Sequence, residues 1–448
     1  DTEIYENYFL FAAKNVASGK VVSFEFAEGE RLDCDGLRRF MRKHLVITFN
    51  GNGFDLPIIY GAIAGFSTAK LKRMANAIIL EKMKPWEVTR EFDFSIPSSI
   101  NHIDLMEVAP GKASLKIYNG RLHGKWMKDL PYDPEDRLTP RQMDRLYDYC
   151  INDLDSTIIL FESLVPQLEL RVTMSRDYGI DLRSKSDAQI AEAVIKKEIG
   201  DILGERPRRP EISPGKWYYY NIPEFIRFRS KELNDILDDI HESKFRVSYS
   251  GSIELPKALA DAVIPIGKGR YRMGIGGLHS SETCAAHVSD DEYVLIDRDV
   301  ASYYPAIILR LGLFPKHLGR VFLKVYKRIV DRRLKAKAEG DKTVADSLKI
   351  TINGLFGKFG SKWAVVYSPD LLIQTTITGQ LSLLMLIERI ERVGIEVVSA
   401  NTDGIVIKCP RARVDELDAI VEGWELDTSF VTEATEYRAL YSRDVINY

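Results

Sequence analysis

The sequence predicts a protein of mixed α/β and α+β class that is built from several domains. Its 448 residues are too many for one hydrophobic core, and the usual size of a domain suggests about three units. Short apolar runs alternate with stretches of helical periodicity along most of the chain, which is the pattern of a fold that mixes strands and helices.

Residues 1–165 are expected to form a single α/β domain. The apolar run 45–49 predicts a buried strand, and the periodicity of residues 141–165 predicts a long helix. Strands flanked by helices in this way are typical of an α/β domain.

Residues 166–290 are interpreted as a connecting region. The segment 196–256 is expected to be irregular, because it contains the proline cluster 206–210 and the aromatic run 217–220. The glycine-rich segment 274–277 allows two interpretations, a simple turn or a flexible backbone that passes close to a sugar-phosphate chain.

The rest of the chain predicts a second mixed domain, in which strands flank a helical segment. The pattern predicts a strand at 293–296, a helical stretch at 321–360, and two strands, 396–399 and 405–408, joined by a turn at 401–404.

The composition argues against several classes of protein. At 45% hydrophobic and 28% charged residues it is ordinary for a soluble protein, and no run approaches the roughly 18 apolar residues of a membrane span. No secretion signal is recognised, so a cytoplasmic location without a membrane partner is expected. Zinc is not indicated, because the four cysteines are scattered without CxxC pairs: Cys34, Cys150, Cys284 and Cys409.

The charge is distributed unevenly. The net charge is only −3, but residues 320–362 contain twelve Lys or Arg against four Asp or Glu. This basic segment is expected to bind something anionic.

Two carboxylates lie at predicted strand ends in the second domain. Asp299 follows the run 293–296, and Asp403 lies in the turn between the last two strands. Carboxylates on adjacent strands can hold two divalent ions, for which Mg²⁺ suits oxygen ligands, and such a pair supports in-line phosphoryl transfer.

The basic segment lies between these carboxylates. Arg333 and Lys337 are four residues apart, as are Lys349 and Asn353, so each pair shares one helix face. Such faces are suited to grip a triphosphate. Taken alone, Lys349 is equally compatible with a solvated helix charge.

Three motifs in this region resemble, in the same order, the polymerase motifs of family B DNA polymerases. They are Asp299-x-x-Ser302-x-Tyr304-Pro305, Lys349-x-x-x-Asn353-Gly354-Leu355-Phe356-Gly357 and Asn401-Thr402-Asp403-Gly404. The resemblance implies a right-hand polymerase palm with helical fingers.

The resemblance also implies roles for single residues. Asp299 and Asp403 become metal ligands, the carbonyl of Val300 adds an oxygen, and Tyr304 becomes the steric gate against ribonucleotides. The side chains that bind the incoming nucleotide are Arg333, with Arg332 as the competing register, Lys337, Lys349 and Asn353.

The chain departs from the family at three positions. The family usually has Ser and Tyr where this chain has Gly354 and Phe356, and Asp where it has Asn401. Because Asp403 is kept and Phe356 keeps an aromatic ring, Asn401 is expected to tune the site rather than to abolish activity.

A second group of acids lies in the first domain. Asp1 and Glu3 are two residues apart, which places both on one face of a strand. Asp55 ends the motif Asn50-x-x-x-Phe54-Asp55, and in Tyr149-x-x-x-Asp153 the phenol and the carboxylate share one helix face.

This order of motifs resembles that of the RNase H-like 3′→5′ exonucleases attached to family B and family A polymerases. By that resemblance Tyr149 orients the attacking water, and Asn50 and Phe54 hold the frayed primer end. Four carboxylates would hold two metal ions: Asp1, Glu3, Asp55 and Asp153.

Two nearby sets of residues are interpreted as structural. Asp148 and Asp155 lack a tyrosine four residues earlier, so they are taken as solvent-facing charges. His102 and Asp104 are taken as a hydrogen-bonded structural pair rather than a catalytic one.

The motifs together imply a template-directed DNA polymerase with a proofreading exonuclease, two Mg²⁺ ions per active site and Mn²⁺ as a substitute. The implied partners are primer-template DNA, dNTPs and replication accessory proteins. The implied order is an RNase H-like exonuclease over 1–165, a palm over 291–320 and 363–410, fingers over 321–362, and the end of the palm with the start of the thumb over 411–448.

The spacing of the motifs has further implications. Their compact arrangement implies a viral or phage replicase, and the short remainder after Asp403 implies an excerpt in which the thumb is largely missing. Two other functions stay open: an exonuclease whose second half only positions DNA, and a nucleic-acid-binding protein on a polymerase scaffold.

Overall fold

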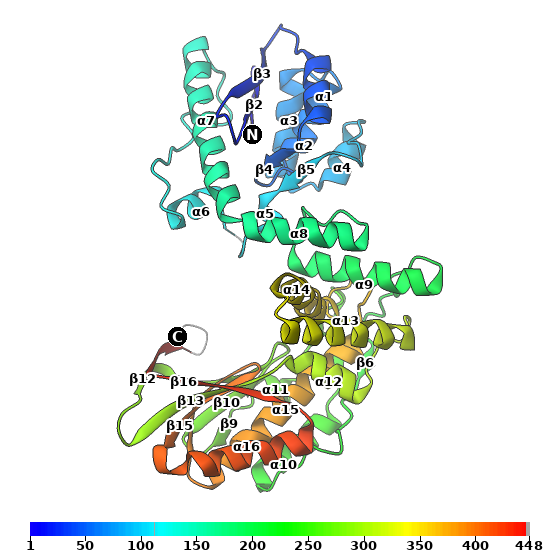
Figure 1. Ribbon diagram of the computed structural model, residues 1–448. Coiled ribbons are helices and arrows are strands. Elements are labelled where there is room, and N and C mark those ends of the chain that lie inside the picture. The colour runs from blue at the N-terminus through cyan, green and yellow to red at the C-terminus, as the bar shows by residue number, and fades with distance from the viewer. Residues whose placement is uncertain (112, 445–448) are drawn as a thin grey trace. The chain divides into compact units, whose positions relative to one another are not determined.

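The computed structural model describes residues 1–111 and 113–444, and the chain divides into two compact units after Asp187 (Figure 1). Three clusters of buried apolar residues lie within the first unit, and a larger one lies within the second. Each unit therefore has a hydrophobic core of its own.

The first unit combines an antiparallel sheet of three strands, a parallel pair of strands and several helices. The sheet consists of β1 (Thr2–Tyr5), β2 (Tyr8–Lys14) and β3 (Val21–Ala27), and the pair of β4 (Val46–Thr48) and β5 (His102–Asp104). The helices are α1 (Cys34–Lys43), α2 (Asp55–Ile63), α3 (Thr68–Ile79), α4 (Pro85–Glu91), α5 (Leu105–Val108), α6 (Leu115–Arg121), α7 (Pro140–Ser163) and α8 (Val165–Tyr178). The strand predicted at 45–49 and the helix predicted at 141–165 are confirmed as β4 and α7.

Helix α7 carries one of the motifs predicted for the first unit, Tyr149-x-x-x-Asp153. A capping box between Thr139 and Gln142, with Pro140 in the first turn, makes it begin sharply. Its buried residues Leu146 and Cys150 pack in one cluster with residues of β1 and β2. The packing holds Tyr149 and Asp153, one turn apart, beside strand β1.

The second unit is built on an antiparallel sheet of seven strands in the order β16-β13-β15-β14-β11-β10-β9. Two smaller sheets, β12-β17 and β6-β7-β8, complete it. The large sheet contains β9 (Ile264–Ile266), β10 (Gly269–Met273), β11 (Leu278–Ser280), β13 (Tyr293–Val300), β14 (Glu396–Asn401), β15 (Gly404–Pro410) and β16 (Thr432–Tyr437). The small sheets contain β6 (Trp217–Tyr218), β7 (Phe245–Val247), β8 (Ile253–Glu254), β12 (Thr283–Val288) and β17 (Ala439–Asp444). The three strands predicted in this part of the chain are confirmed as β13, β14 and β15.

The predicted helical stretch 321–360 consists of two helices that pack against each other. Its helices α13 (Arg320–Glu339) and α14 (Lys342–Lys358) are separated by Gly340, whose φ of 74° is left-handed, and the Asp341 side chain caps α14. The other helices are α9 (Asp187–Leu203), α10 (Lys231–Glu242), α11 (Lys257–Ala260), α12 (Tyr303–Leu311), α15 (Pro369–Arg392) and α16 (Val414–Thr428).

Helix α15 forms the centre of the second unit. Among the described residues it is the one helix that is long and apolar enough to cross a membrane, judged by length and composition alone. Its most apolar stretch of 18 residues has a mean hydropathy of 1.4, yet 94% of that stretch is buried inside the protein. Its apolar residues share a cluster with the large sheet and α16, which is the behaviour of a core helix.

The prediction of an irregular segment at 196–256 was correct for two stretches and wrong for the rest. Helix α9 continues to Leu203, and α10 and the β6-β7-β8 sheet follow, so that the main irregular parts are 204–216 and 219–230. The prediction rested on the prolines and aromatic residues of this segment. It overlooked the apolar face of α10, along which Leu233, Leu237 and Ile240 are buried. The strands of the small sheet have only two or three residues, too few for a visible alternation.

Candidate active sites

Strand pairing places the two acids of the second unit side by side. Asp299 lies opposite Gly404 in the register of β13 and β15, so Asp403 comes directly beside it. The backbone N–H of Val300 donates to the carbonyl of Asp403 at 2.8 Å. Thr402, with a left-handed φ of 57°, forms the tight turn that presents Asp403.

The carboxyl groups at this strand end perturb one another. Burial and the charge of Asp403 raise the pKa of Asp299 to about 6, and burial also raises the pKa of Asp403. Asp297 and Glu433 add smaller repulsion on Asp299. Such crowding of oxygen ligands fits a divalent cation of the Mg²⁺ type, which would relieve the repulsion.

Sequence reasoning missed Asp297 and Glu433. Asp297 precedes Asp299 by two residues on one strand and hence on the same face, a signal that was available. Glu433 reaches the site because β16 pairs with β13 so that Glu433 lies opposite Asp299. No sequence spacing signals that register, because α16 separates β16 from the motifs.

A cavity of about 740 Å³ extends from these carboxylates over α13 and α14. All the polymerase-type residues predicted from the sequence line it: Asp299, Val300, Tyr304, Arg333, Lys337, Lys349, Asn353 and Asp403. Arg332 does not line it, so the structure favours the Arg333 register. The functional roles of these residues stay predictions.

Two of the cations in this cavity have side-chain partners on neighbouring elements. Arg333 donates to the Ser302 hydroxyl at 2.7 Å, and Lys337 to Glu433 at 2.8 Å. Lys349 and Asn353 are exposed along one face of α14. A polyanion in the cavity would meet four donors that come from two helices.

Tyr304 is held on both sides. Its ring stacks on Phe356, with 3.9 Å between centroids and 11° between planes, and its hydroxyl donates to the carbonyl of Gly276 at 2.6 Å. The turn that contains Gly276 is itself held by the buried Gln380. The Gln380 amide oxygen accepts the N–H of Gly274 at 2.9 Å, and its amide nitrogen donates to the C=O of Gly274 at 2.7 Å. The segment 274–277 is therefore an ordered turn between β10 and β11.

The acids of the first unit also come together. The Thr2 hydroxyl donates to Asp55 at 2.8 Å, and the phenol of Tyr149 hydrogen-bonds to Asp153. Burial, followed by the charges of Asp153 and Asp55, raises the pKa of Glu3 to about 8. These carboxylates would lose their mutual repulsion on binding a cation, so they also fit divalent metal ions.

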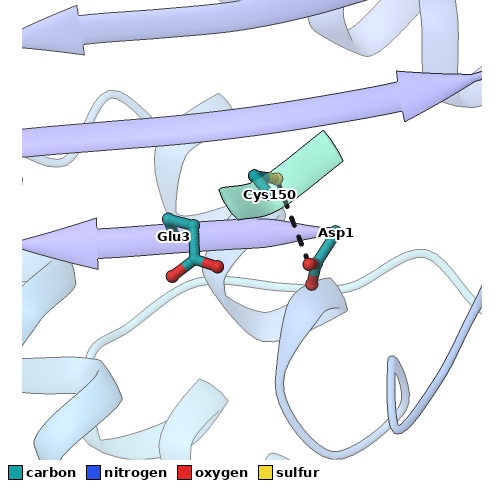
Figure 2. Close-up of side chains that lie close together, drawn as sticks. All are labelled: Asp1, Glu3 and Cys150. Atoms are coloured by element: carbon teal, nitrogen blue, oxygen red, sulfur yellow. Dashed lines mark hydrogen bonds between the residues drawn. The ribbon is translucent and has the colours of Figure 1, made fainter. Parts of the chain in front are cut away.

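Cys150 is an unexpected member of this group (Figure 2). Its Sγ lies 4.0 Å from the nearer Asp1 carboxylate oxygen, and the possible ligand atoms of Asp1, Glu3 and Cys150 all lie within 4.8 Å of one another. Burial raises the pKa of Cys150 to about 12. A protonated thiol is a poor metal ligand, so Cys150 is better described as a buried neighbour of the carboxylates.

A cavity of about 470 Å³ opens beside these acids. Asp1 and Asp153 line it together with Asn50 and apolar residues such as Phe49 and Leu115. Phe54, expected to hold a primer end, is half-buried and packs against a hydrophobic cluster, and its role stays a prediction.

The predicted hydrogen-bonded pair of His102 and Asp104 is wrong: in the described part of the chain each side chain bonds to other partners. The Asp104 carboxylate accepts the backbone N–H groups of Asn50 and Asn52 at 2.8 and 2.9 Å, while the His102 ring contacts the Thr48 hydroxyl at 2.8 Å. Asp104 thus braces the loop that leads to Asp55, a role that its place at the end of β5 did not reveal.

The two acids interpreted as solvent-facing charges are indeed exposed. Asp148 lies on the outer side of α7, and Asp155 forms an ion pair with Lys14.

No model of a known protein family matches the sequence, and no curated protein matches it. Among solved structures the fold is similar to a family B DNA polymerase from the hyperthermophilic archaeon Pyrobaculum calidifontis, with a TM-score of 0.51 and 18% sequence identity. The match covers 98% of this chain and 56% of the archaeal one. The chain therefore has the fold of part of a family B DNA polymerase.

Proposed function

We propose that the chain is a template-directed DNA polymerase with a 3′→5′ proofreading exonuclease. One observation carries the proposal: a single cavity joins two adjacent strand-end carboxylates to four donor side chains and to the clamped ring of Tyr304. Phosphoryl transfer requires positioning and charge neutralisation, and this cavity supplies groups for both.

In the second unit the residues have complementary tasks. Asp299 and Asp403 would hold Mg²⁺, which when bound activates the primer 3′-hydroxyl and neutralises the leaving pyrophosphate. Arg333, Lys337 and Lys349 would hold the triphosphate of a dNTP by charge-assisted hydrogen bonds. Tyr304 would lie against the sugar of the nucleotide and exclude a 2′-hydroxyl.

In the first unit the four carboxylates would hold the metal ions of the exonuclease. Tyr149, hydrogen-bonded to Asp153, would orient the water that attacks the terminal phosphodiester. The apolar wall of the adjoining cavity would receive an unpaired terminal base, with Asn50 at its rim.

The finer assignments belong to the same proposal. We propose a compact viral or phage replicase that acts in the host cytoplasm with accessory replication proteins. The chain spans about half the length of the archaeal polymerase it matches.

The test is an assay with a labelled primer on a longer template in Mg²⁺, with and without the four dNTPs. Asp403→Ala is expected to abolish extension and to keep digestion, and Asp55→Ala to do the reverse. Asp148→Ala, an exposed change on α7, is the control and should keep both activities. Digestion without any extension by the unaltered chain would support the exonuclease alternative, and joint loss of both activities in either variant would contradict two separate sites.

A further inference from the structure

A second cavity of the second unit, of about 550 Å³, is not used by the proposed chemistry. It lies where the end of α9 and the segment 204–210 meet the loop after α14. The residues that line it are all different from those that line the polymerase-type cavity.

The wall of this cavity is rich in free cations. Lys196, Arg206, Arg208 and Arg209 line it, and the three arginines are exposed. Among the described residues, neither Arg206 nor Arg208 forms an ion pair. Burial and the charge of Arg206 lower the pKa of Lys196, and the charge of Glu192 offsets this in part, so Lys196 and Arg206 repel each other.

The acidic groups nearby compensate this charge only in part. One oxygen of Glu192 accepts the backbone N–H of Val365 at 2.8 Å, and the other lies 3.5 Å from Lys358. Glu205 is the second carboxylate in the lining. Positive charge therefore dominates the wall.

An exposed indole stands among these cations. The Trp363 side chain is 69% exposed, with the Arg209 guanidinium 5.3 Å and the Lys362 ammonium 5.1 Å from the ring centroid. An exposed aromatic face flanked by cations is the arrangement on which unpaired bases stack while their phosphates are neutralised.

The loop that carries this indole is anchored. The carbonyl of Val365 contacts the His317 ring at 2.6 Å, and the Tyr367 hydroxyl donates to the carbonyl of Gly251 at 2.8 Å. A platform held in this way loses little conformational entropy on binding.

Helix α14 connects the two cavities. It presents Lys349 and Asn353 to the polymerase-type cavity and ends at Lys358, next to Glu192 of the second cavity. At 1.5 Å per residue, the rise along the axis of α14 from Asn353 to Lys358 is about 8 Å. A strand of a few nucleotides can span this distance.

We infer that this cavity binds single-stranded DNA, with one base stacked on Trp363 and phosphates on Arg206, Arg208 and Arg209. The strand would be the unpaired template that approaches the nucleotide-binding cavity, an assignment that rests on the proposed function. Duplex DNA is a poor fit, because stacking on the indole requires an unpaired base.

The experiment measures binding of a fluorescent oligo-dT strand to the whole chain by anisotropy at fixed salt. Trp363→Ala is expected to weaken binding by about 10-fold, and Trp363→Phe to restore most of it because the ring remains. Joint replacement of the three arginines by Ala should weaken binding further and reduce its salt dependence. Trp86→Ala, which removes an indole that is 63% exposed in the first unit, is the matched control.

The outcomes separate this inference from the proposed function. Unchanged oligo-dT binding by both Trp363→Ala and the triple variant overturns the inference, even if the enzyme extends primers normally. Loss in the triple variant alone overturns the stacking contact. Weaker binding in both variants supports the site even if no extension occurs. The template assignment is supported if both variants raise the KM of extension for templates with long overhangs but not for templates with a one-nucleotide overhang.

Discussion

The clamp on Tyr304 predicts that a residue remote from the substrate controls sugar selection. Gln380, on the core helix α15, bridges both backbone groups of Gly274, and the turn so fixed accepts the Tyr304 hydroxyl through Gly276. Gln380→Leu removes the bridge with little change in volume. The turn would then be free to move, and the hydrogen bond that holds the Tyr304 hydroxyl would be lost.

The size of the effect follows from the bonds that are lost. A net hydrogen bond contributes about 0.5–1.5 kcal/mol, so losing the one between Tyr304 and Gly276 should reduce discrimination against ribonucleotides by about 2- to 13-fold. Leaving the N–H and C=O of Gly274 unpaired should cost a further ~2–4 kcal/mol of stability. Tyr304→Ala, which removes the whole ring, should reduce discrimination far more.

The assay compares kcat/KM for a dNTP and for the matching rNTP in single-nucleotide extension. Tyr304→Phe removes only the hydroxyl, so it should reproduce the Gln380→Leu ratio, and the double variant should add little. Gln374→Leu is the matched control, since Gln374 on the same helix bridges Asn221 with the same chemistry but does not touch the turn.

Two results would refute this reasoning. Discrimination that falls in Tyr304→Phe but not in Gln380→Leu would show that the turn stays in place without its bridge. An equal fall in Gln380→Leu and Gln374→Leu would show a general effect of lost stability rather than a specific clamp.

Two further predictions concern the first unit. Asp104→Asn should reduce exonuclease activity by about 10-fold or more and leave extension unchanged. The Asp104 carboxylate accepts the N–H groups of both Asn50 and Asn52, one on each oxygen, whereas an amide has only one acceptor oxygen. Equal digestion rates for this variant and the unaltered chain would exclude the bracing role. Burial lowers the pKa of His102 from its ordinary 6.5 to about 4, so protons bind preferentially to the unfolded chain and stability is lost as the pH falls through this window. Between pH 7 and pH 4 the free energy of unfolding, measured in urea, should fall by up to about 3 kcal/mol less for His102→Gln than for the unaltered chain. Parallel plots of this free energy against pH for the two proteins would contradict the prediction.

The local elements and the motifs could be predicted from the sequence because they depend on short-range spacing. Helix α7 has a regular helical periodicity, and strand β4 is a compact apolar run, so both were recognised. The pairs Arg333 with Lys337 and Lys349 with Asn353 share helix faces by their spacing alone. The position of Asp403 between two apolar runs was enough to place it in a turn between two strands.

Only the tertiary structure decided which groups meet across the sheet and around the core. Glu433 faces Asp299 through a strand register, Cys150 lies beside Asp1 because α7 packs on the first sheet, and Gln380 reaches Gly274 from a helix about 100 residues later in the chain. The small β6-β7-β8 sheet was missed for a related reason: its strands are too short to show a pattern and form only by pairing with one another. Local spacing therefore determined the candidate chemistry of this protein, and long-range packing determined the neighbours that position and tune it.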